Sequence, residues 1–159
     1  MSGPVVIAVD GPAASGKGTL ARRLAAELGY AYLDTGLLYR AVGLGLIKSG
    51  RDPADEKAAT AAATVFDVAS TDFTHPALRN EKTGNAAGIV AAFPPVRAAL
   101  VEVQRRFATN PPGDAPGAVL DGRDIGTVIW PDAIHKFFIE AKIEERARRR
   151  VKELQDRGD

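Results

Sequence analysis

The stretch of this sequence best suited to chemistry is a glycine-rich loop near the N-terminus. Its residues are Gly11, Pro12, Ala13, Ala14, Ser15, Gly16, Lys17, Gly18 and Thr19. Gly11 and Gly16 allow backbone N–H groups to turn toward a bound phosphate, and Lys17 adds a full positive charge for β- and γ-phosphates. The spacing G-x-x-x-x-G-K is typical of loops that bind nucleoside triphosphates. We predict such a phosphate cradle; a glycine-rich surface turn is the alternative.

One position of the loop departs from the common pattern. Gly18 stands where a Ser or Thr hydroxyl usually contacts Mg²⁺. Thr19 is then left for the α- or β-phosphate, and the metal must rely on phosphate oxygens, waters and a carboxylate elsewhere. Asp121 is the candidate carboxylate, because it directly follows an apolar strand pattern. A loop cap is the alternative role for Asp121.

Two arginines lie where they could hold a phosphoryl group. Arg123 follows Asp121 on the same turn and can form a bidentate fork with phosphate, or it can pair with Asp124. Arg40 follows an apolar helical turn, so it either extends to solvent or reaches a substrate phosphate beside Thr35.

Three further arginines are weaker candidates. Arg97 has the spacing of a solvated helix residue. Arg146 and Arg150 are four residues apart on a predicted helix, so both can approach one anion, although a solvated charged face is the usual alternative. Together these cations indicate phosphoryl transfer, which depends on positioning and charge neutralisation.

The elements around these residues predict an α/β fold. An apolar strand, a loop and a helix begin the chain, and this order requires a parallel sheet with right-handed crossovers. We predict a three-layer P-loop fold with helices on both faces of the sheet, because ligands then bind at the carboxyl ends of the strands. The patterns place strands at 5–9, 30–33, 118–121 and 137–139, and helices at 20–28, 36–47, 52–66, 96–107 and 143–154.

Several local features are also predicted. Asp52-Pro53 has the pattern of a cap followed by a first-turn proline, and residues 67–85 read as loop with Gly84-Asn85 as breakers. Leucines spaced by four predict an amphipathic first helix: Leu20, Leu24 and Leu28. Apolar residues of the last helix predict its buried stripe: Ile143, Ala147, Val151 and Leu154.

Composition limits the class of protein. The chain has 159 residues, 45% of them hydrophobic and 26% charged, with a formal net charge of +1 and no cysteine. Disulfide and thiolate metal sites are thereby excluded, and the near-neutral charge gives no reason to expect nucleic acid or a membrane as partner. The first strand pattern begins too early to leave room for a signal peptide. We expect a cytoplasmic monomer.

Four motifs together resemble bacterial cytidylate kinases, and the resemblance extends over nearly the whole chain. They lie at residues 11–19, 32–40 (Y-L-D-T-G-L-L-Y-R), 91–97 (A-A-F-P-P-V-R) and 121–127 (D-G-R-D-I-G-T). The resemblance implies transfer of the ATP γ-phosphoryl group to CMP or dCMP with Mg²⁺. A kinase for another small acceptor and a nucleotide-binding protein without catalysis are the alternatives.

The resemblance also implies roles for individual residues. Lys17, Arg123 and Asp121 would serve catalysis, and the loop from Gly11 to Thr19 would bind ATP together with Arg146 and Arg150. The expected CMP-binding residues are Thr35, Tyr39, Arg40, Arg79, Arg97, Arg123 and Asp124.

The resemblance implies a single P-loop kinase domain over residues 1–159. Within it, residues 50–115 would form the insertion that binds the nucleoside monophosphate, and residues 143–159 would lead into a lid that is not present. Two departures are visible. Gly88 stands where the family places a serine on the base-reading side, and residues 72–78 are too short for the family's small β insert.

Overall fold

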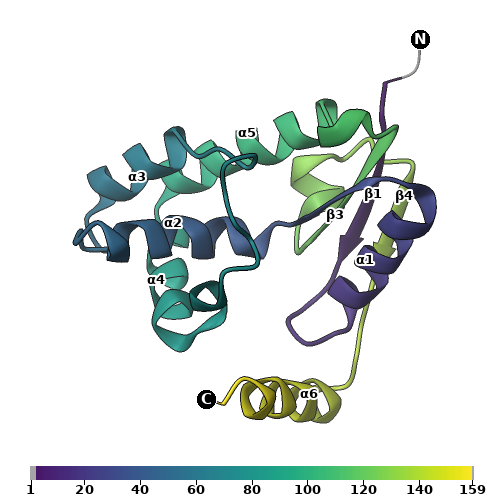
Figure 1. Cartoon of the computed structure of the whole chain (residues 1–159). Helices are drawn as coiled ribbons and strands as arrows, with labels where there is room; N and C mark the ends of the chain where they lie inside the picture. The colour runs from purple at the N-terminus through teal and green to yellow at the C-terminus, as the bar shows by residue number, and fades with distance from the viewer. Residues whose placement is uncertain (1–2, 159) are drawn as a thin grey trace. The chain divides into compact units, whose positions relative to one another are not determined.

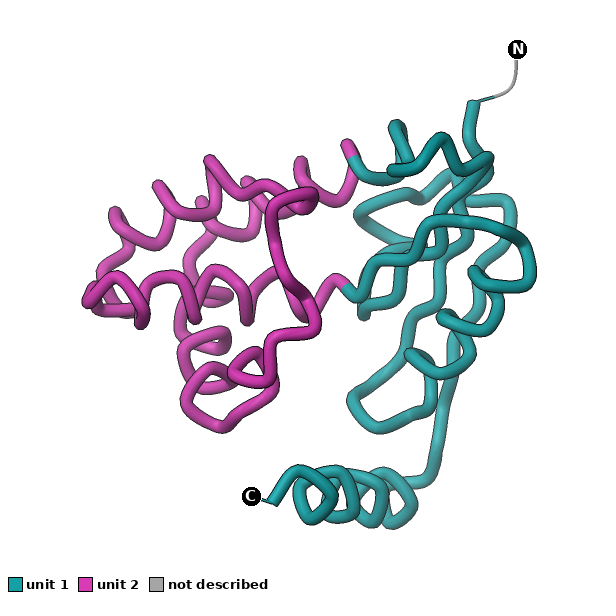
Figure 2. Tube along the Cα trace, in the orientation of Figure 1, with its two compact units in different colours: residues 1–34, 107–159 teal, residues 35–106 magenta. Residues whose placement is uncertain are grey.

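A computed structural model describes residues 3–158 and divides them into two compact units (Figure 2). The sheet unit contains the described residues up to Asp34 and those from Phe107 onward. The helical unit contains Thr35–Arg106.

The sheet unit is built on four parallel strands in the order β2-β3-β1-β4. Figure 1 labels β1, β3 and β4 of this sheet. The parallel α/β architecture predicted from the sequence is therefore confirmed. All the strands lie close to their predicted positions: β1 Val5–Asp10, β2 Ala31–Asp34, β3 Gly117–Gly122 and β4 His135–Phe138.

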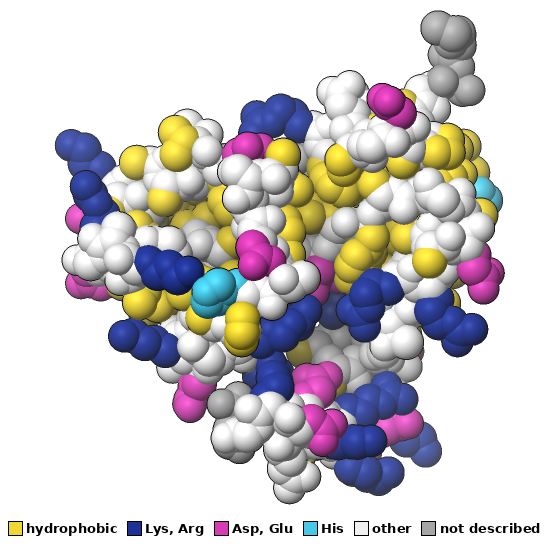
Figure 3. All heavy atoms as spheres, viewed as in Figure 1, with side chains coloured by type: hydrophobic (Ala, Val, Ile, Leu, Met, Phe, Trp, Pro, Cys, Tyr) yellow, Lys and Arg dark blue, Asp and Glu magenta, His cyan; other side chains and the backbone are white. Residues whose placement is uncertain are grey.

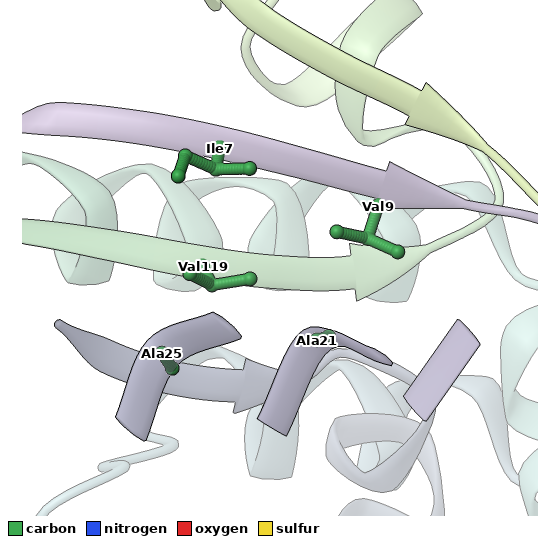
Figure 4. Close-up of a cluster of buried hydrophobic side chains, with 5 residues drawn as sticks. All are labelled: Ile7, Val9, Ala21, Ala25 and Val119. Carbon is green, nitrogen blue, oxygen red and sulfur yellow. The ribbon is translucent and has the colours of Figure 1, made fainter. Parts of the chain in front are cut away.

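Helix α1 (Lys17–Leu28) packs on this sheet through small residues (Figure 4). The cluster between α1 and the sheet consists of Ile7, Val9, Ala21, Ala25 and Val119. Leu20 and Leu28 are instead 40% and 44% exposed. Leu24 packs against the cluster, as the leucine spacing predicts, but the alanines occupy the innermost positions and allow α1 to lie close to the strands.

The helical unit contains α2 (Gly36–Lys48), α3 (Glu56–Thr64), η1 (Pro76–Arg79), α4 (Glu81–Ala91) and most of α5 (Pro94–Thr109). Close packing holds the glycine-containing helix α2. A Cβ added at Gly43 would lie 3.0 Å from the Ala86 Cβ and 3.1 Å from the Ala87 backbone nitrogen. Glycine at position 43 therefore lets α4 approach α2 this closely without a shift of either helix.

The predicted start of α3 is wrong. Helix α3 begins at Glu56, where Asp55 Oδ1 accepts a hydrogen bond from the Ala58 backbone N–H at 3.1 Å. Asp52 Oδ1 accepts instead from the Ala54 N–H at 2.9 Å, within a turn. A second aspartate three residues along the chain therefore takes the capping role.

The prediction of loop throughout residues 67–85 is also wrong, because α4 begins at Glu81. Asn80 Oδ1 caps this helix by accepting from the Thr83 N–H at 2.8 Å. A Cβ at Gly84 would lie 3.0 Å from the Arg40 Nη2 atom, so the glycine makes room for that guanidinium. Tertiary packing thus overrides the low helix propensity of glycine.

The C-terminal part of the sheet unit contains η2 (Pro112–Asp114), the π-helix η3 (Ile125–Ile129) and α6 (Ile143–Asp156). No residue of α6 is buried, and Ile143 and Val151 are 76% and 54% exposed. The predicted buried stripe is therefore wrong. Helix α6 contacts the glycine-rich loop at residues 11–19, the phosphate loop, through arginine side chains rather than through its apolar face.

Among the described helices, none alone is long and apolar enough to cross a membrane. One pair, Glu81–Ala91 with Pro94–Asp114, passes such a test only when joined, and it is bent by 102° at the break.

Candidate functional site

The loop between β1 and α1 has the backbone geometry of a phosphate cradle. Gly16 adopts a φ of 92° and Ala14 a φ of 59°, both in the left-handed region. A Cβ at Gly11 would clash with the backbone oxygen of Ile139. As the motif predicts, position 16 favours glycine because of its φ, and position 11 favours glycine because of the close approach of Ile139.

The hydroxyl of Ser15 is a buried polar group of this loop. Ser15 is 4% exposed, and within the described part of the chain its Oγ is buried without a hydrogen-bond partner. A Cβ at Gly11 would lie 3.0 Å from this Oγ, so the hydroxyl lies against the start of the loop. A buried hydroxyl without a partner is costly, and a phosphate oxygen would satisfy it.

Two arginines of α6 bind the carbonyl oxygens of the loop. Arg146 Nε donates to Ala13 O at 3.0 Å, and Arg149 Nη1 donates to Ala14 O at 3.2 Å. Arg150 forms an ion pair with Glu153 at 3.3 Å instead. Figure 3 shows the mixture of basic and acidic side chains that α6 carries. Arg149 was missed in the sequence, although it lies three residues from Arg146 and thus on the same helix face.

A cavity of about 790 Å³ lies beside the loop in the sheet unit. Three cationic side chains line it, those of Arg123, Lys142 and Arg146, together with the carboxylates of Glu140 and Glu145. The loop residues Gly11 and Pro12 form part of the same wall. The structure therefore brings the predicted residues Arg123 and Arg146 to one cavity, with a charge suited to an anionic group.

Asp121 lies at the end of β3, 2% exposed and opposite Asp34 in the parallel register. The Tyr32 hydroxyl donates a hydrogen bond to Asp121 Oδ2. Burial raises the pKa of Asp121 to about 6, and the charge of Asp34 adds to this rise, while the Tyr32 hydrogen bond and Lys17 oppose it. Burial, followed by the Asp121 charge, also raises the pKa of Tyr32, so this hydroxyl remains a donor.

This raised pKa predicts how stability depends on pH. The folded chain binds the Asp121 proton more tightly than an unfolded chain with the ordinary value of 3.8. The corresponding stabilisation is complete below that value and is lost as the pH rises through about 6. Asp121→Asn removes this loss and is expected to raise the free energy of unfolding at about pH 8 by about 2 kcal/mol, with little change near pH 4.

Urea unfolding of both proteins at the two pH values measures this difference. Asp132→Asn, at an exposed aspartate, is the matched control and is expected to change neither value. A gain for Asp121→Asn that is equal at both pH values would contradict the prediction.

Asp10 joins the phosphate loop to the D-G-R-D-I-G-T segment. Its Oδ1 accepts from the Ile125 N–H and its Oδ2 from the Gly126 N–H, both at 2.9 Å. The Gly11 N–H donates to Gly122 O at 3.1 Å, which ties the same two segments. Asp10 is 7% exposed and was missed in the sequence, where its only signal is a carboxylate that ends an apolar strand.

These hydrogen bonds hold the segment that bears Arg123 and Asp124 at both of its ends, through Gly122 before it and Ile125 after it. Burial raises the pKa of Asp124, and the negative charge of Asp10 contributes to the rise. The backbone hydrogen bonds to Asp10 thus fix the start of η3, directly after these two predicted site residues.

The residues present are compatible with Mg²⁺ bound together with a triphosphate. No group of three or more metal-ligating side chains occurs among residues 3–158. Asp34 and Asp121 are instead register partners at the ends of β2 and β3, and Lys17 is close enough to act on the Asp121 charge. Mg²⁺ commonly takes one or two protein carboxylates and completes its shell with phosphate oxygens and water.

Most residues predicted to bind the monophosphate lie in the helical unit. Arg40 Nη1 donates to Leu78 O at 2.9 Å and to Asn80 O at 3.4 Å, so it contacts the residues on both sides of Arg79. Arg97 Nη1 donates to Ala91 O at 2.8 Å, at the end of α4.

The remaining predicted positions of this unit lie on its helices. Thr35 and Tyr39 lie at the N-cap and in the first turns of α2. A Cβ at Gly88 would meet nothing within 4 Å. The space for a larger residue at position 88, such as the serine of the family pattern, is therefore available.

The comparisons with known proteins agree with these motifs. A family profile described as cytidylate kinase matches residues 7–159. The chain belongs to the cytidylate kinase family. The resemblance inferred from the four motifs is thus confirmed, and with it the class of nucleoside monophosphate kinases.

Two cytidylate kinases illustrate the similarity. The enzyme of Rhodospirillum rubrum is 59% identical over 154 residues, which cover 97% of this chain and 71% of that protein. The enzyme of Paramagnetospirillum magneticum is 59% identical over 156 residues, which cover 96% of this chain and 71% of that protein. The crystal structure of TT1252 from Thermus thermophilus matches 99% of this chain and 80% of its own, with 23% identity and a TM-score of 0.46, too low to support an inference.

Proposed function

We propose that this cytidylate kinase family member transfers the γ-phosphoryl group of ATP to CMP and dCMP, in line and without a covalent enzyme intermediate. The observation that carries the proposal is the phosphate loop, whose buried Ser15 hydroxyl has no partner among the described residues. The choice of cytidylate as the acceptor rests on the names of the relatives. A cytoplasmic monomer that acts on small molecules, rather than on nucleic acid or a membrane, is part of the proposal.

The loop would bind the donor. Backbone N–H groups of Ala13 to Thr19 and the N-terminus of α1 favour negative charge, and Lys17 begins that helix. Arg146 would act from α6 on phosphates beside the loop carbonyls that it already contacts. We retain Arg150 as a proposed ATP-binding residue, and Arg149 joins it on the evidence of its contact with Ala14.

The proposed cofactor is Mg²⁺, which would neutralise charge on the ATP phosphates. Asp121 would hold its hydration shell, because the carboxylate lies at the strand end beside the loop.

The proposed acceptor-binding residues are Arg123 and Asp124 of the sheet unit, and Arg40, Arg79 and Arg97 of the helical unit. Arg123 is placed in the cavity beside the loop, where a bidentate guanidinium can bind a phosphoryl group. Arg97 and Asp124 would read the cytosine edge, because a guanidinium donates and a carboxylate accepts hydrogen bonds.

An ATP-consumption assay with a panel of acceptors tests this function. CMP and dCMP are expected to be phosphorylated, and UMP, AMP and shikimate to be poor acceptors. Turnover with AMP but not with CMP would exclude the proposed acceptor. Binding of ATP by calorimetry, without transfer to any acceptor, would exclude catalysis.

A further inference from the structure

Gly18, where the common loop pattern has a Ser or Thr hydroxyl, lies beside Asp121 and Tyr32. A Cβ added at Gly18 would lie 3.9 Å from Asp121 Oδ2 and 3.9 Å from Tyr32 Oη. The hydroxyl of a Ser or Thr at this position is therefore within reach of the same carboxylate oxygen that accepts the Tyr32 hydrogen bond.

Tyr32 is held firmly in this position. It lies on β2, is half-buried, and packs against the apolar cluster between the sheet and α1. Its hydroxyl donates to Asp121 across 89 residues of sequence. The backbone register supports this contact, because Asp34 pairs with Asp121 and Tyr32 pairs with Val119 on the neighbouring strand.

Arg22 and Asp34 are the other charged groups around this pair. Asp34 raises the pKa of both Tyr32 and Asp121, and Arg22 acts in the opposite direction on both. A buried carboxylate between a second carboxylate and two cations can rotate toward any of them unless a hydrogen bond fixes it. The rigid phenol on strand β2 provides such a bond.

We propose that Tyr32 is a positioning residue whose hydroxyl, extending from strand β2 into the space beside Gly18, orients Asp121 toward the metal shell of bound ATP. The proposal rests on the proposed function, because Asp121 must face Mg²⁺ with its phosphates. It deepens that function by assigning a role to a residue outside the phosphate loop. Hydrogen-bond partners of metal-facing carboxylates typically contribute 10- to 100-fold to metal affinity or activity.

Calorimetric titration with ATP, in the presence of Mg²⁺ and in its absence, tests the proposal on the intact chain. Tyr32→Phe is expected to weaken binding of ATP with Mg²⁺ by about 10-fold or more, and to leave binding of ATP without Mg²⁺ unchanged. Tyr30→Phe is the matched control, because Tyr30 packs against the same cluster. It is expected to alter neither titration.

A rescue experiment separates positioning from folding. Gly18→Ser has room, since the nearest atom to its Cβ is Arg22 Nη1 at 3.4 Å, on a flexible side chain. Added to Tyr32→Phe, it is expected to restore part of the Mg²⁺-dependent affinity, whereas Gly18→Ala in the same background is not. The melting temperature of each variant is measured alongside.

The outcomes separate the two proposals. Equal weakening of both titrations by Tyr32→Phe, or a loss of melting temperature with no change in Mg²⁺ dependence, would overturn the role of Tyr32 while leaving the kinase function intact. Equal rescue by Ala and Ser at position 18 would overturn it as well. A wild-type chain that binds no ATP would overturn the proposed function and this assignment together.

Discussion

Lys17→Ala is expected to lower the turnover of CMP phosphorylation by about 100- to 1,000-fold, the loss typical of removing one group that stabilises transition-state charge. Lys17 begins α1, directly after the left-handed Gly16 of the phosphate loop. Its charge also acts on Asp121. Removal therefore leaves developing charge on the transferring phosphoryl group without its nearest mobile cation.

Steady-state kinetics with ATP and CMP measure this effect. Lys57→Ala, at an exposed lysine of α3, is the control for loss of a positive charge and is expected to have wild-type turnover. If Lys17→Ala raises the KM for ATP and leaves kcat unchanged, Lys17 contributes to substrate binding and not specifically to the transition state. Unchanged kinetics would refute the assignment of the loop as a phosphate cradle.

The β1-loop-α1 unit was predictable because every signal for it is local. An apolar strand, glycines where only glycine fits, and a helix-forming sequence lie within residues 5–28, and the structure has each in place. The strands β2, β3 and β4 were found for the same reason, since short apolar runs bounded by polar residues predict buried parallel strands.

The missed helix α4 shows where local signals fail. Gly84-Asn85 lowers the intrinsic helix propensity, yet Gly84 is the residue that accommodates the Arg40 guanidinium from α2. The partner is 44 residues earlier in the chain, and one sequence does not reveal the contact. The Asn80 cap was the local signal that could have found this helix.

The exposed stripe of α6 has a related cause. Periodicity shows which residues share a face of a helix, and it does not show whether that face meets a partner. In the sheet unit the contacts of α6 with the phosphate loop come from Arg146 and Arg149. The apolar residues Ile143 and Val151 remain exposed.

The residues that orient the site were the hardest to predict, because their partners are remote. Tyr32 and Asp121 are 89 residues apart, and Asp10 and Ile125 are 115 apart. Motifs identify residues that touch a ligand, while such positioning contacts depend on which strands become neighbours. The order β2-β3-β1 brings both pairs together, and this order cannot be derived from spacing alone.

Arg97→Ala is expected to raise the KM for CMP by about 10- to 100-fold, the loss of one or two hydrogen bonds from a charged group, and to leave the KM for ATP unchanged. Arg97 is exposed on α5, and its side chain donates a hydrogen bond to Ala91 O at the end of α4 at 2.8 Å. If Arg97 only joins α4 to α5, Arg97→Ala is expected to lower stability and to change the KM values for CMP and ATP equally.

Three measurements distinguish base recognition from this structural role. Arg105→Ala, on the same helix and paired with Glu102 at its surface, is the matched control and is expected to have wild-type kinetics. Arg97→Lys can still donate to Ala91 O but loses the planar fork of arginine, so it is expected to retain the wild-type melting temperature and to share the raised KM for CMP. Equal effects of Arg97→Ala on the KM values for CMP and ATP would remove Arg97 from the base site, because a residue that reads cytosine must discriminate between the acceptor and the donor.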